Sequence, residues 1–80
     1  AADENLDFRN EIGNQALEYL KLCLVSSEDA LNMVSEKGLD IDLFEDGINE
    51  SSYRYFGDTV IDHGCINEDM IEILEEILND

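Results

Sequence analysis

Positive charge is scarce in this 80-residue chain. Four Lys and Arg residues stand against twenty-one Asp and Glu residues, which gives a formal net charge of −17 at pH 7. A surface this acidic repels the phosphate backbone of nucleic acids and the anionic lipids of membranes. These absences exclude nucleic acid and membrane as partners and favour basic, cationic or apolar ones.

Long apolar runs are also missing. The longest run is Leu22–Val25, whereas a membrane-spanning helix needs about 20 apolar residues. The first residues show neither the basic segment nor the apolar stretch of a signal peptide, so we expect a cytoplasmic protein. The chain does not begin with Met, which suggests the C-terminal part of a longer protein. Its apolar fraction of 44% is enough for the core of one domain, but its length is too short for two.

Cysteine and histidine are too few to indicate a metal centre or a disulfide framework. Cys23 and Cys65 are expected to be small buried side chains in a reducing compartment, although one disulfide between them stays open. His63 and Cys65 form a His-x-Cys pair without the second pair that a zinc site requires. We therefore expect His63 to be an exposed turn residue.

Proline is absent, so helices must be ended by glycine and by capping side chains. Residues 1–7 are mostly polar and are expected to form a flexible N-terminal segment, followed by a single domain over 8–80. Apolar spacing predicts helices over 8–25 and 28–37, one from Ile41 that ends at Gly57, and a last one over 68–78. Residues 59–66 have the β-branched and turn residues of a small hairpin. The predicted fold is mainly α, with four helices and a hairpin between the third and the fourth, in a winged-helix-like arrangement.

The acidic side chains suggest cation binding, but no EF-hand motif is present. In either register near Asp40 and Asp42, Phe44 occupies a position that requires an oxygen ligand. The acids are dense in two stretches, which are Asp40, Asp42, Glu45, Asp46 and Glu50, and Glu68, Asp69, Glu72, Glu75, Glu76 and Asp80. Like charges three or four residues apart repel on a helix, and a cation or a basic partner would relieve that repulsion. Glu72, Glu75 and Glu76 are therefore candidate partner-binding residues, with a solvated acidic face as the alternative.

Catalytic motifs are missing as well. The chain has no Gly-x-Ser-x-Gly, P-loop or Gly-x-Gly-x-x-Gly motif, and no Asp-Ser attachment site of an acyl carrier protein. We predict that it is not an enzyme and has no resident cofactor. The run Tyr53-Arg54-Tyr55-Phe56 is the one concentration of aromatic residues. Some of its rings must point into the core, whereas Tyr53 and Arg54 are candidates for contact with a partner.

The second half of the chain resembles a known family. The segments that carry the resemblance are Lys37-Gly38-Leu39, Asp46-Gly47-Ile48-Asn49-Glu50, Phe56-Gly57-Asp58, and Ile66-Asn67 with Met70, Ile71 and Leu74. In their order and spacing, residues 28–78 are similar to the TerB-C family, the C-terminal domain associated with tellurite-resistance TerB proteins. The resemblance implies a non-catalytic domain of a multidomain bacterial stress or phage-defence protein. It also implies metal chelation by Glu50 and Asp58, which the residues alone explain as a solvated helix face and a turn.

Three functions follow from these observations. The leading one is an acidic protein-interaction or regulatory module that works with other domains of a parent protein or with a basic protein surface. The second is a domain that binds a divalent cation through surface carboxylates. The third is a DNA mimic, whose carboxylates imitate phosphates and inhibit a DNA-binding protein.

Overall fold

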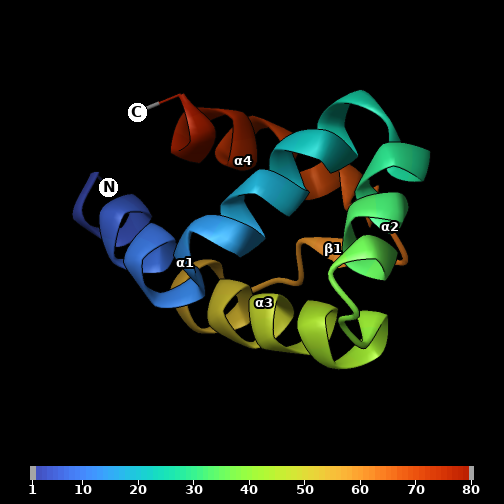
Figure 1. The fold of residues 1–80 in the computed structure, drawn as a ribbon. Helices are drawn as coiled ribbons and strands as arrows, with labels where there is room; N and C mark the ends of the chain where they lie inside the picture. Colours follow the sequence, from blue (N-terminus) through green and yellow to red (C-terminus); the bar gives the residue numbers. More distant parts are fainter. Residues whose placement is uncertain (1, 80) are drawn as a thin grey trace.

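The computed structural model describes residues 2–79 and confirms the predicted fold class (Figure 1). Three long helices, α1 (Ala2–Val25), α2 (Ser27–Glu36) and α3 (Ile41–Phe56), precede a short antiparallel hairpin of β1 (Ile61–Asp62) and β2 (Cys65–Ile66). A 3-10 turn at Glu68–Met70 then leads into α4 (Ile71–Leu78). The described chain is therefore mainly helical and winged-helix-like, with the hairpin between its third and fourth helices.

Helix α1 begins earlier than the sequence predicted. We expected a flexible segment over 1–7 and a helix from Phe8, but the helix starts at Ala2 and Asn5 is buried. Gly13, with a φ of 86° and a ψ of 169°, breaks α1 into two helical parts, so the part before it can direct a face of its own toward the core. The part before Gly13 has its own inward face, with Asn5, Phe8 and Ile12 at helical spacing. Residue 1 lies outside the described residues.

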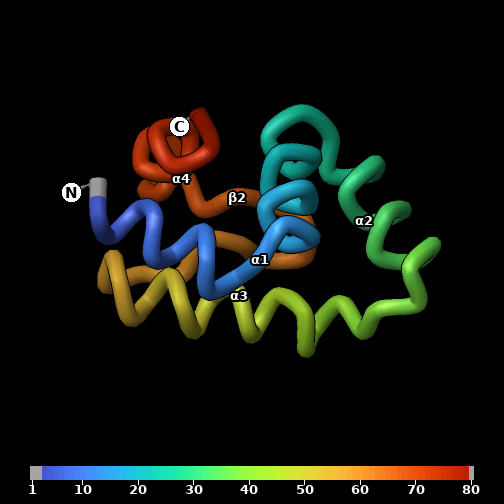
Figure 2. Tube along the Cα trace, turned by 60° about the vertical axis from the view of Figure 1, so that its left-hand side comes forward, coloured from blue at the N-terminus to red at the C-terminus, as the bar shows by residue number. Residues whose placement is uncertain are grey.

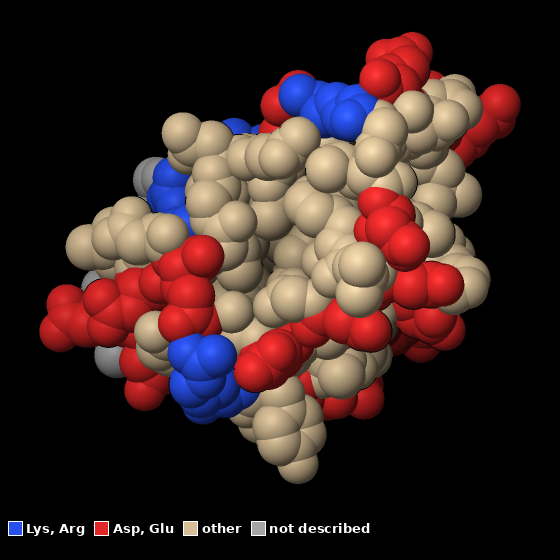
Figure 3. Space-filling model, turned by 60° about the horizontal axis from the view of Figure 1, so that its bottom comes forward, with Lys and Arg blue, Asp and Glu red and all other residues tan. Residues whose placement is uncertain are grey.

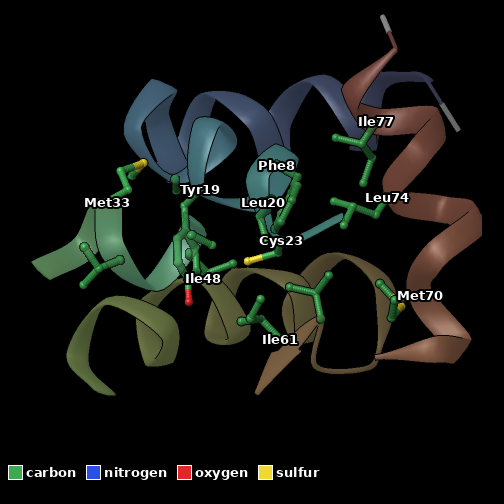
Figure 4. Close-up of a cluster of buried hydrophobic side chains, with 14 residues drawn as sticks. Phe8, Tyr19, Leu20, Cys23, Met33, Ile48, Ile61, Met70, Leu74 and Ile77 are labelled. Atoms are coloured by element: carbon green, nitrogen blue, oxygen red, sulfur yellow. The ribbon is translucent and has the colours of Figure 1, made fainter. Parts of the chain in front are cut away.

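The second part of α1 crosses the middle of the molecule (Figures 1 and 2). Helix α1 as a whole packs against α2, α3, α4 and β2. Tyr19 and Leu20 of this part are fully buried. Around them the core gathers Phe8, Ala16, Cys23, Ala30, Met33, Val34, Ile48, Val60, Ile61, Met70, Leu74 and Ile77 (Figure 4). Each helix therefore contributes its apolar stripe to one shared core.

The helix ends are formed by capping side chains and by glycines, as expected for a chain without proline. The Ser26 hydroxyl accepts a hydrogen bond from the Asp29 N–H, and Asp40 caps α3 in the same way through the N–H groups of Asp42 and Leu43. Gly38 and Gly57 have positive φ angles of 69° and 79° after α2 and α3. Local side-chain chemistry thus sets the helix boundaries in the absence of proline.

The hairpin is closed by a two-residue turn. Ile61 pairs with Ile66 and Asp62 with Cys65, so His63 and Gly64 form the loop. Their φ angles are 48° and 81°, and a turn with two positive φ values is the type I′ turn that suits short hairpins. Cys65 is exposed here, so the expectation of two buried cysteines holds for Cys23 and is wrong for Cys65.

Candidate functional site

A polar stripe on α3, formed by the buried Glu45 and Ser52 and the half-buried Asn49, is the first feature that could carry a function. The three residues are spaced by four and by three, which places them on one face of the helix. This face is directed toward the segment 58–64, which contains β1 and the hairpin turn. The question is whether these groups serve chemistry or the fold.

Glu45 has the most buried carboxylate of the described chain, with 4% of the residue exposed. Its Oε2 accepts hydrogen bonds from the Tyr19 hydroxyl at 2.6 Å and from the Gly64 N–H at 2.8 Å. Its Oε1 accepts one from the His63 N–H at 2.7 Å, and His63 Nδ1 lies 3.9 Å away. The bonds to two backbone amides and a buried hydroxyl make Glu45 a structural anchor for the turn.

The sequence grouped Glu45 with the solvated acids of residues 40–50, and this interpretation is wrong. A signal for the correct position was present, because Glu45 falls on the same helical face as the apolar residues Ile41 and Ile48. An acid at an otherwise inward position indicates a buried partner. The partner here is the turn at His63 and Gly64, whose backbone amide groups cannot be recognised from the sequence.

Asn49 and Ser52 hold the rest of the same segment. The Asn49 side chain accepts hydrogen bonds from the N–H groups of Val60 and Ile61, both at 3.0 Å, and donates one to the Ile61 carbonyl at 2.8 Å. The Ser52 hydroxyl donates to the Asp58 carbonyl at 2.8 Å. The polar stripe therefore satisfies the backbone of a segment that has almost no sheet of its own.

Burial also changes the acidity of two groups near Glu45. It raises the pKa of the Tyr19 hydroxyl above its ordinary value of 10.0, and the hydrogen bond to Glu45 adds to this rise. Burial raises the pKa of the Cys23 thiol from 9.0 to about 12. Both groups stay protonated at neutral pH, so Cys23 is not activated as a nucleophile.

A groove between α1 and α3 is the second feature, and it is open to solvent. It encloses about 270 Å³. Its lining is mostly apolar and consists of Glu11, Ile12, Ala16, Leu43, Phe44, Gly47, Ile48 and Ser51. Ile48 is buried below the groove, whereas Leu43 at its edge is 72% exposed.

Carboxylates accompany this groove along the outer side of α3. Asp42, Asp46 and Glu50 are exposed and follow each other at intervals of four residues, which forms one row on the helix. Figure 3 shows acidic side chains beside a largely uncharged area that is hollowed near its centre. We call Leu43, the lining of the groove and this row of carboxylates the α3 surface.

The aromatic run of α3 divides as the sequence predicted. Tyr55 and Phe56 are partly buried and pack edge-on against Phe8, with ring centroids 6.4 and 5.3 Å apart. Tyr53 is 65% exposed and so is available for contact. Arg54 forms an ion pair with Glu11 and lies 5.9 Å from the Tyr55 ring. A hydrogen bond with Ser51 and this ion pair lower the pKa of Glu11 below its ordinary value.

The candidate metal ligands and the acids of the last helix lie on the surface. Glu50 is exposed on α3, and the Asp58 carboxylate accepts a hydrogen bond from the Thr59 N–H in the loop after that helix. Within residues 2–79, no three His, Cys, Asp or Glu side chains are grouped in a way that could hold a metal ion. Glu72, Glu75 and Glu76 are exposed on α4, away from the lining of the groove.

Comparison with known proteins adds no identification. No family model, curated protein or solved structure matches this chain significantly. The similarity of residues 28–78 to the TerB-C family therefore stays a prediction from sequence segments. Among the described helices, none is both long and apolar enough to cross a membrane.

Proposed function

We propose that this chain is a non-catalytic protein-interaction module that binds its partner through the α3 surface and Tyr53. The observation that carries the proposal is Leu43, a large apolar side chain that is 72% exposed beside an apolar groove and a row of carboxylates. The polar stripe on α3 does not compete with this assignment, because Glu45, Asn49 and Ser52 form hydrogen bonds with the hairpin segment.

The energetic argument is that exposed apolar side chains next to a preformed groove are the part of a surface that gains most from being covered. Burial of an exposed Leu contributes about 1.5–3 kcal/mol, and aromatic side chains are frequent among the residues that dominate binding. Leu43 and Tyr53 are both on α3, and the carboxylates Asp46 and Glu50 lie between them in the sequence. Such a mixture of apolar and charged groups is typical of an interface with a polar rim.

An affinity experiment tests the proposal. The immobilised chain is incubated with extract from cells that express it naturally, beside a variant with Leu43→Ala and Tyr53→Ala. We expect a protein that the wild type retains and the double variant loses by about tenfold or more, which corresponds to about 1.4 kcal/mol. The control is Val25→Ala, which removes an 84% exposed apolar side chain at the end of α1 and should leave retention unchanged. Identical protein sets for wild type and double variant would contradict the proposal.

We propose further that the module belongs to a larger bacterial stress or defence protein of the TerB-C type. The support is the similarity of residues 28–78 in sequence, together with a fold that consists of helices and one small hairpin. The gene sequence upstream of the codon for Ala1 tests this proposal. An ATPase or TerB domain in the same reading frame would agree with it, and a start codon directly before Ala1 would contradict it.

A further inference from the structure

We infer that the partner group recognised by the groove is a basic amphipathic helix, with apolar anchor residues on one face and Lys or Arg beside them. This inference rests on the proposed function and names the chemistry of the partner. Three features of the groove support it: its shape, the glycine in the middle of its α3 wall, and the charge beside it.

The shape of the groove fits one short helix. The α3 residues that line it run from Leu43 to Ser51, a rise of about 12 Å along the helix axis, which equals roughly two helical turns. Two turns of a partner helix present anchor residues at positions i, i+4 and i+7. Addition of a strand is a poor alternative, because both walls of the groove are helices and supply no free sheet edge.

Gly47 lets the partner approach closely. It lies in the middle of the α3 wall, and a Cβ atom placed on it would meet nothing within 4 Å. The floor on either side is formed by Phe44 and Ile48 of α3 and by Ala16 of α1. A small residue between apolar neighbours leaves a depression into which one apolar anchor side chain fits.

The acidic side chains near the groove determine the sign of the charge that the partner must carry. Glu11 lines one end of the groove, and Glu50 lies on the same side of α3 as Leu43 because seven residues are close to two full turns. Arg54 and Glu11 offset each other in their ion pair, so the acidic charge beside the groove is that of the exposed row Asp42, Asp46 and Glu50. The whole chain carries a net charge of −17, which disfavours a second copy of itself and favours a segment rich in Lys and Arg.

A designed peptide provides the probe. It has about four helical turns, with Leu at positions i, i+4, i+7 and i+11 and with Lys and Ala elsewhere. The matched control peptide has the same composition in an order that gives no amphipathic face. Binding is followed by ¹H–¹⁵N NMR of the full chain. We expect the patterned peptide to bind at least about tenfold more tightly than the control peptide, with the largest shifts at Ile12, Ala16, Gly47 and Ile48.

Two variants of the protein then test whether the peptide binds in the groove. Gly47→Leu fills the depression with a helix-favouring residue, so the fold is retained while affinity falls by about tenfold or more. Asn32→Leu adds the same side chain to an exposed position of α2 and leaves affinity unchanged. Equal binding of both peptides, with shifts spread over the acidic faces, would overturn the inference. The proposed function would still stand if retention of the partner in the affinity experiment depends on Leu43 and Tyr53. Failure of both experiments would overturn both the inference and the proposed function.

Discussion

At the scale of single residues, the central feature is a carboxylate in the interior of a strongly acidic protein. Glu45 accepts hydrogen bonds from Tyr19, His63 and Gly64, and these donors offset the cost of removing its charge from water. The same burial keeps Tyr19 and Cys23 protonated. Two predictions concern this group of side chains.

Replacement of Glu45 by Gln is expected to destabilise the fold by about 1–3 kcal/mol, because the amide NH₂ group faces donors that need an acceptor. The control is Asp46→Asn, which removes the same charge from the exposed neighbour and should change stability by no more than about 0.5 kcal/mol. Urea denaturation measures both. Hydrogen exchange at the His63 and Gly64 amides should accelerate only in the Glu45 variant, and equal behaviour of the two variants would contradict the anchoring role.

Stability is expected to fall with alkaline pH. The folded-state pKa of Cys23 is about 12 against 9.0 for an ordinary thiol. Above pH 9 the unfolded thiol therefore ionises while the folded one does not, so stability is complete below pH 9 and decreases as pH rises toward 12. Urea midpoints between pH 8 and pH 11 measure the slope, which should be smaller in Cys23→Ala. Cys65→Ala, which removes the exposed cysteine, should keep the slope of the wild type.

At the scale of secondary-structure elements, two glycines inside helices have opposite roles. Gly13 has backbone angles that only glycine adopts readily, and it separates the two parts of α1. Gly47 is within the regular part of α3. Because neither position has an atom within 4 Å of an added Cβ, conformation alone decides the effect of a substitution.

The same substitution should therefore change stability in opposite directions. Gly13→Ala is expected to cost about 1–3 kcal/mol, because alanine is strained at this combination of φ and ψ. Gly47→Ala should stabilise the protein by about 0.5–1 kcal/mol, because alanine loses less conformational freedom in a helix. Thermal and urea denaturation measure both changes. Destabilisation of similar size at the two positions would show that packing, and not backbone conformation, decides the result.

The attachment of the hairpin depends on Asn49. Asn49→Ala removes three hydrogen bonds to Val60 and Ile61 and is expected to cost about 2–4 kcal/mol, at roughly 1 kcal/mol for each bond. Hydrogen exchange at the Val60 and Ile61 amides should increase by a corresponding factor. Asn32→Ala on the exposed side of α2 is the matched control and should have little effect. Unchanged exchange at both amides would contradict the assigned bonds.

Local chemistry explains which elements could be predicted from the sequence. Helix ends depend on residues that are adjacent to them in the sequence, so they can be predicted from it. Examples are Ser26, Gly38, Gly57 and Asn67. The buried position of Glu45 depends on contacts with residues 19, 63 and 64, and no local pattern displays contacts across the fold. The groove could not be predicted for the same reason, since its two walls are about thirty residues apart in the chain. The apolar spacing predicted one continuous helix over 8–25, whereas Gly13 divides α1 into two parts.

At the scale of the whole molecule, the net charge of −17 acts against the compact state. We expect NaCl to raise the melting temperature, because screening shortens the range of repulsion from about 10 Å at 0.1 M to about 3 Å at 1 M. A gain of 1 kcal/mol corresponds to about 4–8 °C for a domain of this size. Differential scanning calorimetry at a series of salt concentrations measures the change. No rise in melting temperature would mean that the carboxylates are too far apart to repel.

The same experiment separates screening from specific cation binding. CaCl₂ and MgCl₂ are compared with NaCl at equal ionic strength. An additional rise that disappears in Glu50→Gln and Asp58→Asn would support the proposal of a divalent site at these residues. Glu72→Gln is the matched control on α4, and it should retain any rise that belongs to Glu50 and Asp58. Equal melting temperatures in all three salts would leave screening as the explanation.

The polar stripe on α3 has a consequence for how this domain can change during evolution. The hydrogen bonds that Glu45, Asn49 and Ser52 form with residues 58–64 all go to peptide groups. Amino-acid replacements at exposed positions such as Thr59 and Asp62 therefore leave every one of these bonds in place. An insertion or deletion would shift all peptide groups beyond it out of register with the helix. In homologous chains we expect this loop to vary at its exposed positions, to keep apolar residues at Val60 and Ile61 and glycine at Gly64, and to stay constant in length.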